Sequence, residues 1–272
     1  MSGQIVCLGD SITQRGWEVR TRGWVAQLAE AYVRTHDVVN RGFGGYTTRW
    51  AVNLLPRMLP ASSPRTRLVT ILFGANDAQL APYKQHVPLD EFERNLHHIL
   101  DALQRPGSPM YAPQASIVLI TPPVVGEEMW EEHLRRTGRP MDRRREVTRE
   151  YAEAVVRVAR ERKVVCVDLW AATEKIVGES ADGYAGVLVD GLHLNAAGND
   201  LLFGLLSDTI RRQLPHLDPA TIPLPLPHHS AVVSGSAEEF ERYLKTHRDI
   251  PPDDRRSEIT APSAEDMLLN RN

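Results

Sequence analysis

Cysteine is scarce in this sequence, with only Cys7 and Cys166 among 272 residues. Each lies in an apolar run rich in β-branched residues, where a small buried hydrophobic side chain is expected. A disulfide between them would require their two strands to be neighbours. With so few cysteines and an intracellular setting expected from the N-terminal sequence, we predict two free thiols.

The sequence also lacks an excess of charge of one sign and any long apolar run. The formal net charge is −3, which gives no general attraction to nucleic acids or anionic membranes. No stretch approaches the roughly 18 uninterrupted apolar residues of a membrane-spanning helix. The N-terminal residues MSGQIVCLGDS enter a strand pattern at once, without the basic and apolar segments of a signal peptide. We therefore expect a soluble, cytoplasmic protein with no nucleic-acid partner and no integral membrane association.

Motifs for metals and phosphates are missing as well. The sequence contains no HExxH, CxxC or GxxxxGK[ST] motif. Two adjacent histidine pairs, His97-His98 and His228-His229, would point their rings apart on a helix or strand. Solvated surface histidines explain these pairs better than a metal site, so we predict no metal and no other cofactor.

Short β-type runs alternate along the chain with helical patterns. All but the second β-type run contain a near-continuous apolar stretch, as in strands covered on both faces. The expected strands are Gln4–Gly9, Asp37–Arg41, Arg67–Gly74, Ser116–Thr121 and Lys163–Leu169. The expected helices are Gly23–Thr35, Thr47–Leu59, Leu89–Leu103, Asp142–Arg162 and Asn195–Leu214. Strands separated by helices predict right-handed crossovers and hence an α/β fold, a three-layer α/β/α sandwich on a five-stranded parallel sheet of flavodoxin-like type.

Two regions depart from this alternation. Pro122–Pro140 is a long predicted connection that contains Trp130, and long connections in compact domains tend to be functional, so it is a candidate wall of a substrate cleft. After Leu214 the chain becomes Pro-rich and cannot form a regular helix or a central strand. We therefore predict a main domain at 1–215 and an appendage at 216–272.

The appendage contains two short helical patterns, Ser236–His247 and Pro262–Arg271. Phe240 and Leu244 are four residues apart and would share one face of the first helix. Such a face could dock on its own domain or on a second subunit, so a homodimer through the appendage is one expectation. A mostly disordered tail explains the charge and proline content equally well.

The first candidate for chemistry is Ser11, in the run Gly9-Asp10-Ser11-Ile12-Thr13 directly after the first expected strand. Binding sites in open α/β sheets lie beyond the carboxyl ends of the strands, which is where Ser11 would emerge. A hydroxyl there is nucleophilic only with a base in hydrogen-bond reach. The alternative is that Ser11 caps a following helix or turn.

The second candidate is the pair Asp190 and His193, just before the last amphipathic helix. A carboxylate three residues from a histidine can turn back to hold the Nδ1 proton, which leaves Nε2 free to accept a proton from Ser11. A surface aspartate and a structural histidine are the alternative. The pair gains meaning only together with other groups of a site.

Two turns at the same predicted edge supply hydrogen-bond donors. One contains Gly44-Gly45 after the second strand, and the other contains Asn76-Asp77 after the third. An ester-cleaving site needs donors aimed at the developing oxyanion, and a glycine N–H and an asparagine amide are suitable. The simpler interpretations are a tight turn for Gly44-Gly45 and a helix cap or Asx turn for Asn76-Asp77.

Taken in order, the blocks GDSIT, GFGGYTT, GAND and DGLHLN resemble the four conserved blocks of the GDSL/SGNH hydrolase superfamily. They span most of the predicted main domain. Their flanks, including NRGFGGYTTRW, ILFGANDA and DGLHLNAAGNDLLF, are similar to the isoamyl acetate-hydrolysing esterase subgroup. The nucleophile near the N-terminus differs from the G-x-S-x-G elbow of α/β-hydrolases.

This resemblance implies a role for each matching residue. Ser11 would be the nucleophile and, through its own N–H, one oxyanion donor; His193 would be the general base and acid, and Asp190 would orient it. Gly45, which directly precedes the polar turn residues, would supply the second backbone donor in preference to Gly44. Asn76 would donate its side-chain amide.

The resemblance further implies hydrolysis of carboxylic esters, a small-molecule ester as the partner, and short-acyl apolar esters such as acetates as substrates. Thioesterase, lysophospholipase or sugar-deacetylase activity on the same site is the nearest alternative. A non-catalytic acyl-binding module is an alternative of a different class, although every block residue is intact.

Overall fold

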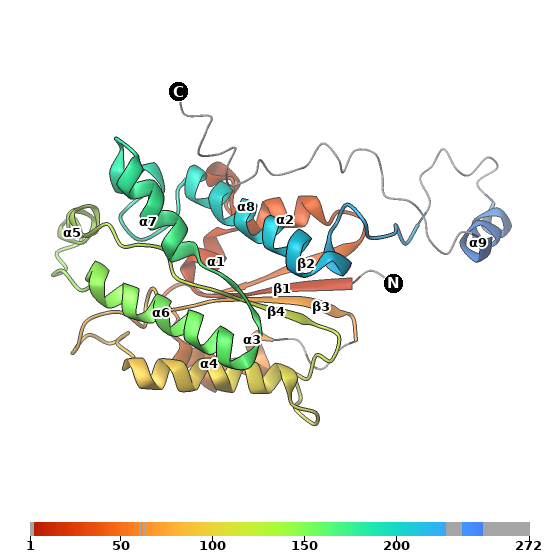
Figure 1. Ribbon diagram of the computed structural model, residues 1–272, viewed down its shortest axis with the longest axis horizontal. Coiled ribbons are helices and arrows are strands. Elements are labelled where there is room, and N and C mark those ends of the chain that lie inside the picture. The colour runs from red at the N-terminus through yellow and green to blue at the C-terminus, as the bar shows by residue number, and fades with distance from the viewer. Residues whose placement is uncertain (1–2, 60, 62–63, 227–235, 247–272) are drawn as a thin grey trace.

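A computed structural model describes residues 3–59, 61, 64–226 and 236–246. Five strands form one parallel sheet in the order β2-β1-β3-β4-β5 (Figure 1). The strands are β1 (Gly3–Gly9), β2 (His36–Gly42), β3 (Thr66–Leu72), β4 (Ser116–Ile120) and β5 (Val165–Val167). Because every pairing is parallel, all carboxyl ends lie at one edge. The predicted α/β/α fold with a five-stranded parallel sheet is confirmed.

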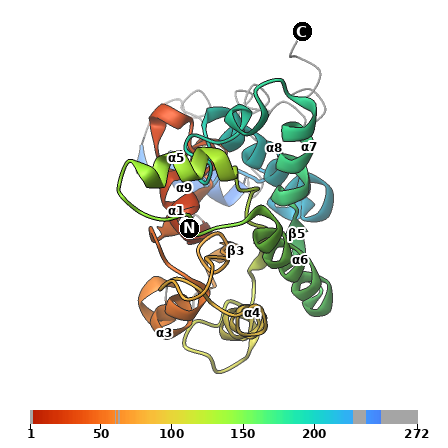
Figure 2. The same cartoon turned by 90° about the vertical axis from the view of Figure 1, so that its left-hand side faces the viewer.

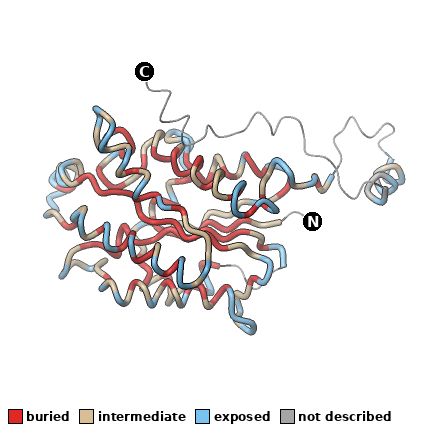
Figure 3. Tube along the Cα trace, in the orientation of Figure 1, coloured by how far each residue is buried: buried red, intermediate tan, exposed pale blue. Residues whose placement is uncertain are grey.

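The apolar run in β1 shows why the strands lack polar alternation. Ile5 and Cys7 belong to the hydrophobic cluster on one face of the sheet, and Val6 and Leu8 belong to the cluster on the other. All four are fully buried. Since successive side chains point to opposite faces, only a sheet covered on both sides requires a continuous apolar run. Figure 3 shows the sheet as a buried layer between two outer layers.

Helices cover both faces of the sheet (Figure 1). One layer consists of α1 (Ser11–Arg15), α2 (Trp24–Ala31), α7 (Leu169–Glu179) and α8 (Ala196–Gln213). The opposite layer consists of α3 (Thr48–Met58), α4 (Leu89–Gln104) and α6 (Arg145–Arg162). Short 3-10 helices lie at Val19–Thr21, Gly183–Gly186 and Pro215–Leu217. In Figure 2 the edge with the carboxyl ends of the strands faces the viewer, and α1 and α5 (Glu127–Arg135) lie there.

Three α-helices were not predicted from the sequence, namely the five-residue α1 together with α5 and α7. The expected connection Pro122–Pro140 contains α5, which buries Trp130 and Leu134, four residues apart on one face. The segment expected as the strand Lys163–Leu169 is a three-residue strand followed at once by α7. The side chain of Asp168 caps α7 by accepting the Ala171 N–H at 3.0 Å. A strand and a helix that are both apolar and nearly contiguous give no periodicity from which to place the boundary.

The two cysteines are free, as predicted. Cys7 lies on β1 and Cys166 on β5, and β3 and β4 separate these strands in the sheet. Burial raises the pKa of Cys7 and of Cys166 to about 12 each. Both thiols therefore remain protonated at neutral pH; Cys7 lies in the core, and the partly buried Cys166 packs against the hydrophobic cluster on the other face of the sheet.

The first part of the Pro-rich segment after α8 packs against the α/β domain. Leu217 is 1% exposed and Leu224 is 3% exposed, and the Leu217 carbonyl accepts the Tyr32 hydroxyl at 2.5 Å. Further on, α9 (Ala237–Thr246) matches the first expected tail helix. The side chains of Phe240 and Leu244, and all of Pro262–Arg271, lie outside the described residues. The boundary at residue 215 and the homodimer stay predictions. Within the described ranges, no helix is long and apolar enough to cross a membrane.

Candidate active site

Ser11 and His193, although 182 residues apart, meet at the carboxyl edge of the sheet. Ser11 is the first residue of α1, directly after β1. Asp10 caps this helix, since its Oδ1 accepts the Ile12 N–H at 2.9 Å, so Ser11 is not the cap. His193 lies in the turn that leads to α8, where Asn195 is the cap and accepts the Gly198 N–H at 2.9 Å.

A chain of two hydrogen bonds joins the serine, the histidine and the aspartate. The Nε2 atom of His193 lies 2.9 Å from the Ser11 hydroxyl, and its Nδ1 atom lies 2.7 Å from Asp190 Oδ2. Burial alone would raise the pKa of Asp190. The hydrogen bonds from His193, the charge of its ring and the hydrogen bond from the Leu192 N–H outweigh burial and hold the pKa of Asp190 well below its ordinary value. Asp190 is therefore an ionised acceptor that fixes the proton on Nδ1 and leaves Nε2 facing the hydroxyl.

The turn that holds Asp190 and His193 is braced by α5. Asp190 Oδ1 accepts the N–H groups of Leu192 at 3.0 Å and His193 at 2.8 Å. Gly191 has a φ of +92°, and a Cβ atom there would lie 2.4 Å from the Trp130 nitrogen. Its carbonyl accepts the Gly126 N–H at 2.9 Å. The segment Pro122–Pro140 thus contributes a helix that supports the histidine turn.

Gly45 and Asn76 lie in adjacent turns after β2 and β3. Asn76 is 3% exposed, and its Nδ2 donates to the Tyr46 carbonyl at 2.9 Å. Because an amide nitrogen carries two hydrogens, a second donor remains on Asn76. The Gly44 N–H donates to Gln14 Oε1 at 2.7 Å, whereas no acceptor among the described residues takes the Gly45 N–H. This difference favours Gly45 over Gly44 as a donor to a bound molecule.

Two residues near this constellation were not proposed as individual site residues from the sequence. Trp130 on α5 lies edge-on to the His193 ring, with ring centroids 6.4 Å apart. Arg143, which precedes α6, is 2% exposed and donates to Asn76 Oδ1 at 3.0 Å. Arg143 is one of three consecutive arginines, and a sequence pattern cannot tell which of them is buried.

Two buried aspartates, Asp10 and Asp77, are the sequence neighbours of Ser11 and Asn76. Burial raises the pKa of Asp10 to about 7; the Asp77 charge adds to the rise, and the Ile12 N–H and Arg143 oppose it. Burial also raises the pKa of Asp77 to about 6, against hydrogen bonds from Thr48. For each, the Oδ2 atom has no hydrogen-bond partner among the described residues. Both carboxyls therefore hold their protons more tightly in the folded chain than in the unfolded chain.

This difference predicts that part of the stability is lost as the pH rises. The contribution of Asp10 is complete below its unfolded pKa, near 3.8, and is lost as the pH rises through its folded value of about 7. Asp10→Asn keeps the acceptor for Ile12 and cannot ionise, so unfolding should depend less on pH, by up to about 1.4 kcal/mol per pH unit. Urea unfolding of both proteins between about pH 4 and pH 7 measures this. Parallel curves for the two proteins would contradict it.

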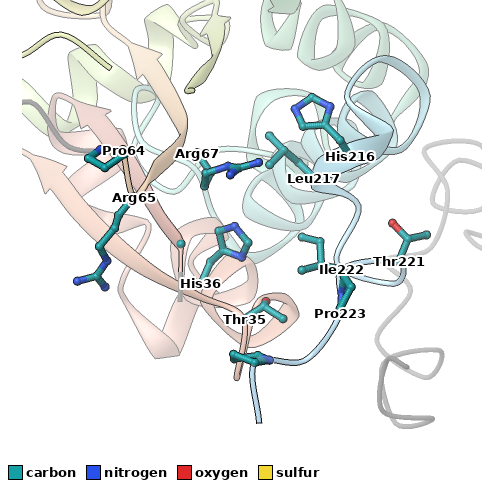
Figure 4. A pocket seen from close by; sticks show the side chains of 12 residues that line it. Thr35, His36, Pro64, Arg65, Arg67, His216, Leu217, Thr221, Ile222 and Pro223 are labelled. Atoms are coloured by element: carbon teal, nitrogen blue, oxygen red, sulfur yellow. The ribbon is translucent and has the colours of Figure 1, made fainter. Parts of the chain in front are cut away.

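A cavity of about 430 Å³ lies at the opposite edge of the sheet and is separate from this constellation (Figure 4). Residues at the amino ends of the first three strands line it together with the segment after α8. As for metals, no group of three potential ligands occurs in the part of the chain that the structure describes. His97 contacts Glu161 at 3.3 Å, and His228-His229 lies outside the described residues.

A hydroxyl, an imidazole and a carboxylate joined in this way at the edge of a parallel sheet are the arrangement of a serine hydrolase. Residues 7–201 match the model of the GDSL-like Lipase/Acylhydrolase family, and the chain belongs to this family. It is an ester hydrolase, and the resemblance found in the sequence is confirmed.

Relatives agree with this assignment, and a solved structure agrees with the fold. The chain is 38% identical to a GDSL esterase/lipase of Arabidopsis thaliana, covering 85% of this chain and 94% of that protein. It is 36% identical to the human isoamyl acetate-hydrolyzing esterase 1 homolog, covering 86% of this chain and 90% of that protein. An acetylxylan esterase from Geobacillus stearothermophilus shares the fold, with a TM-score of 0.57, 21% identity and coverage of 77% of this chain and 95% of that chain.

Proposed function

We propose that the protein hydrolyses short-acyl, apolar carboxylic esters through an acyl-enzyme on Ser11. The observation that carries this is the 2.9 Å contact between the Ser11 hydroxyl and His193 Nε2, backed by Asp190. Such a contact lets the imidazole take the hydroxyl proton as the oxygen attacks a carbonyl carbon.

In the first half of the reaction, Ser11 Oγ bonds to the ester carbonyl carbon and His193 Nε2 receives the proton. The carbonyl oxygen becomes an oxyanion, for which the N–H groups of Ser11 and Gly45 and the Asn76 amide are the donors. The bond to the alcohol oxygen then breaks, and His193 gives its proton to the leaving alkoxide. The products of this half are a free alcohol and an ester of Ser11.

In the second half, water replaces the alcohol. His193 takes a proton from the water, whose oxygen attacks the acyl carbon, and the same donors face the second oxyanion. Collapse of this intermediate breaks the bond to Ser11 Oγ, which regains a proton from His193. The acid is released and the enzyme returns to its starting state.

The acyl-enzyme can be trapped directly. Mixing the protein with excess p-nitrophenyl acetate and quenching in acid should leave one acetyl group on the peptide that contains Ser11, seen by mass spectrometry. The steady-state level of this species depends on whether deacylation is slow, so a fluorophosphonate probe, which cannot be hydrolysed off readily, serves as the companion measurement. If neither an acetyl group nor the probe is found on Ser11, the mechanism is refuted.

The preference for short acyl groups is supported by the relatives named as isoamyl acetate-hydrolyzing esterase homologs. We expect kcat/KM to be highest for p-nitrophenyl acetate or butyrate and to fall for octanoate and dodecanoate, because a short acyl pocket rejects the longer chains. The same series, extended by acetylated sugars, tests the alternatives. A maximum at dodecanoate would favour a lysophospholipase or a long-chain thioesterase, and a strong preference for acetylated sugars would favour a deacetylase.

A further inference from the structure

Arg143 is a buried cation at the centre of the loops that carry Gly45 and Asn76. Its Nε atom donates to the Ala75 carbonyl at 2.9 Å, and its Nη1 atom donates to Asp142 Oδ1 at 2.9 Å. Its Nη2 atom donates to Asn76 Oδ1 at 3.0 Å and to Gln85 Oε1 at 3.1 Å. These bonds use four of the five N–H groups of the guanidinium.

The bond to Asn76 determines which way its side-chain amide faces. A guanidinium has donors only, so it can accept no N–H group from the amide. Turning the amide by half a turn would replace Oδ1 by an NH₂ group, and donors would then face donors. Arg143 therefore keeps Oδ1 on its own side and Nδ2 on the other, where one hydrogen binds the Tyr46 carbonyl and the second is available.

The same argument applies to Gln85. Its Oε1 atom accepts from Arg143, so its Nε2 atom must face away, and it donates to the Gly45 carbonyl at 2.7 Å. Gly45 has a φ of +79°, a conformation that glycine adopts without steric cost. Arg143 thus holds one proposed donor directly and the peptide of the other through Gln85.

The charge of Arg143 is balanced within the same group of residues. Asp142 is 2% exposed and accepts hydrogen bonds from Trp130 Nε1 at 2.8 Å and from Gln79 Nε2 at 2.7 Å. Burial opposes ionisation of Asp142, but the Arg143 charge and these hydrogen bonds lower its pKa below the ordinary value. The Trp130 ring, 5.1 Å from Arg143 Cζ, also faces the cation. A charged guanidinium is therefore a stable part of this interior.

We propose that Arg143 is a positioning residue of the oxyanion hole, which orients the amide of Asn76 and, through Gln85, the turn at Gly45. This rests on the proposed function. Arg143 acts on kcat through these two residues, because correctly aimed donors matter most when the oxyanion forms. A lysine cannot replace it, since one ammonium group cannot reach four acceptors in the plane of a guanidinium fork.

The test is a set of double-mutant cycles in hydrolysis of p-nitrophenyl acetate. We expect Arg143→Lys to lower kcat by about 10- to 100-fold with little change in KM, less than the roughly 10²–10³-fold cost of losing a donor outright. In Asn76→Ala and in Gln85→Ala backgrounds, adding Arg143→Lys should cost several-fold less than in the wild type. A purely structural role would give the same factor in every background, which would overturn the proposal.

Arg144→Lys is the matched control. The Arg144 side chain is 51% exposed and pairs with Glu127 at 2.7 Å, so its replacement should leave kcat and KM unchanged. Melting curves of every variant separate misfolding from mispositioning. If Arg143→Lys does not fold, Gln85→Glu keeps the acceptor for Arg143 and removes the donor to Gly45. It should then lower kcat at constant KM, and an unchanged kcat would overturn the proposal.

The two hypotheses fail in different ways. Loss of activity in Ser11→Ala together with strictly additive cycles would refute only the role of Arg143. Full activity in Ser11→Ala would refute the proposed function. The proposed role of Arg143 in the oxyanion hole would then fail as well.

Discussion

Ser11→Ala is expected to lower kcat for p-nitrophenyl acetate by at least about 10⁴-fold, while KM changes little. The hydroxyl oxygen is the atom that bonds to the substrate carbon in the proposed mechanism, so no other group can replace it. Residual hydrolysis would come from direct attack of water on the ester carbonyl, with the remaining donors stabilising the oxyanion. Initial rates under saturating substrate, with active protein counted by fluorophosphonate labelling of the wild type, provide the measurement.

Ser116→Ala is the control for this experiment. Ser116 opens β4 at the opposite edge of the sheet, and its hydroxyl lies 3.2 Å from His216 Nε2. We expect this variant to keep wild-type kcat, which shows that loss of a hydroxyl as such is harmless. Equal rates for Ser11→Ala and the wild type would end the assignment of Ser11 as nucleophile.

Asp190→Asn is expected to reduce kcat by roughly 10⁴-fold without unfolding the protein. The asparagine keeps the size of the side chain but removes the charge that stabilises a protonated His193. Its amide nitrogen can also face Nδ1, which would place the imidazole proton on Nε2 and prevent it from accepting the Ser11 proton. Rates and melting temperatures of the variant and wild type, measured together, separate catalysis from stability.

Asp182→Asn, in the exposed turn at the start of the 3-10 helix Gly183–Gly186, is the matched control and should retain full activity. Because the pKa of Asp190 lies well below its ordinary value, Asp190 stays ionised under mildly acidic conditions. A loss of wild-type activity there should therefore report on another group. An Asp190→Asn variant with wild-type kcat would show that the carboxylate is not needed to orient His193.

Most of the sheet was predictable because four of its five strands meet a physical requirement that the sequence displays, whereas β2, which is only partly buried, lacks it. A strand covered on both faces needs an unbroken apolar run, and the run at Ile5–Leu8 meets it. The helices α5 and α7 were missed for opposite reasons. The flanking prolines and charges of α5 suggested a loop, whereas the apolar start of α7 merged with the strand before it.

Ser11 could be proposed because its motif follows a strand at the carboxyl edge of a parallel sheet, whereas Asp190 and His193, just before the last helix, could be proposed only together with the other blocks that resemble the GDSL/SGNH hydrolase superfamily. Nothing comparable marks Arg143 or Gln85, and Trp130 was noted only as part of the long connection Pro122–Pro140. Their importance comes from contacts between segments distant in sequence, such as the bond from Arg143 to Asn76 across 67 positions. Composition and periodicity describe a residue's own segment, so they cannot show which arginine of a charged run enters the interior.

The separation of Ser11 from His193 by 182 residues affects when a newly made chain becomes active. The ribosome delivers the serine first and its partner base only after all five strands have been synthesised, and a domain generally folds as a unit. On the proposed mechanism, a nascent chain carries an inert serine for most of its translation. Ester hydrolysis can thus begin only once the turn that carries His193 has docked at the carboxyl edge of the sheet.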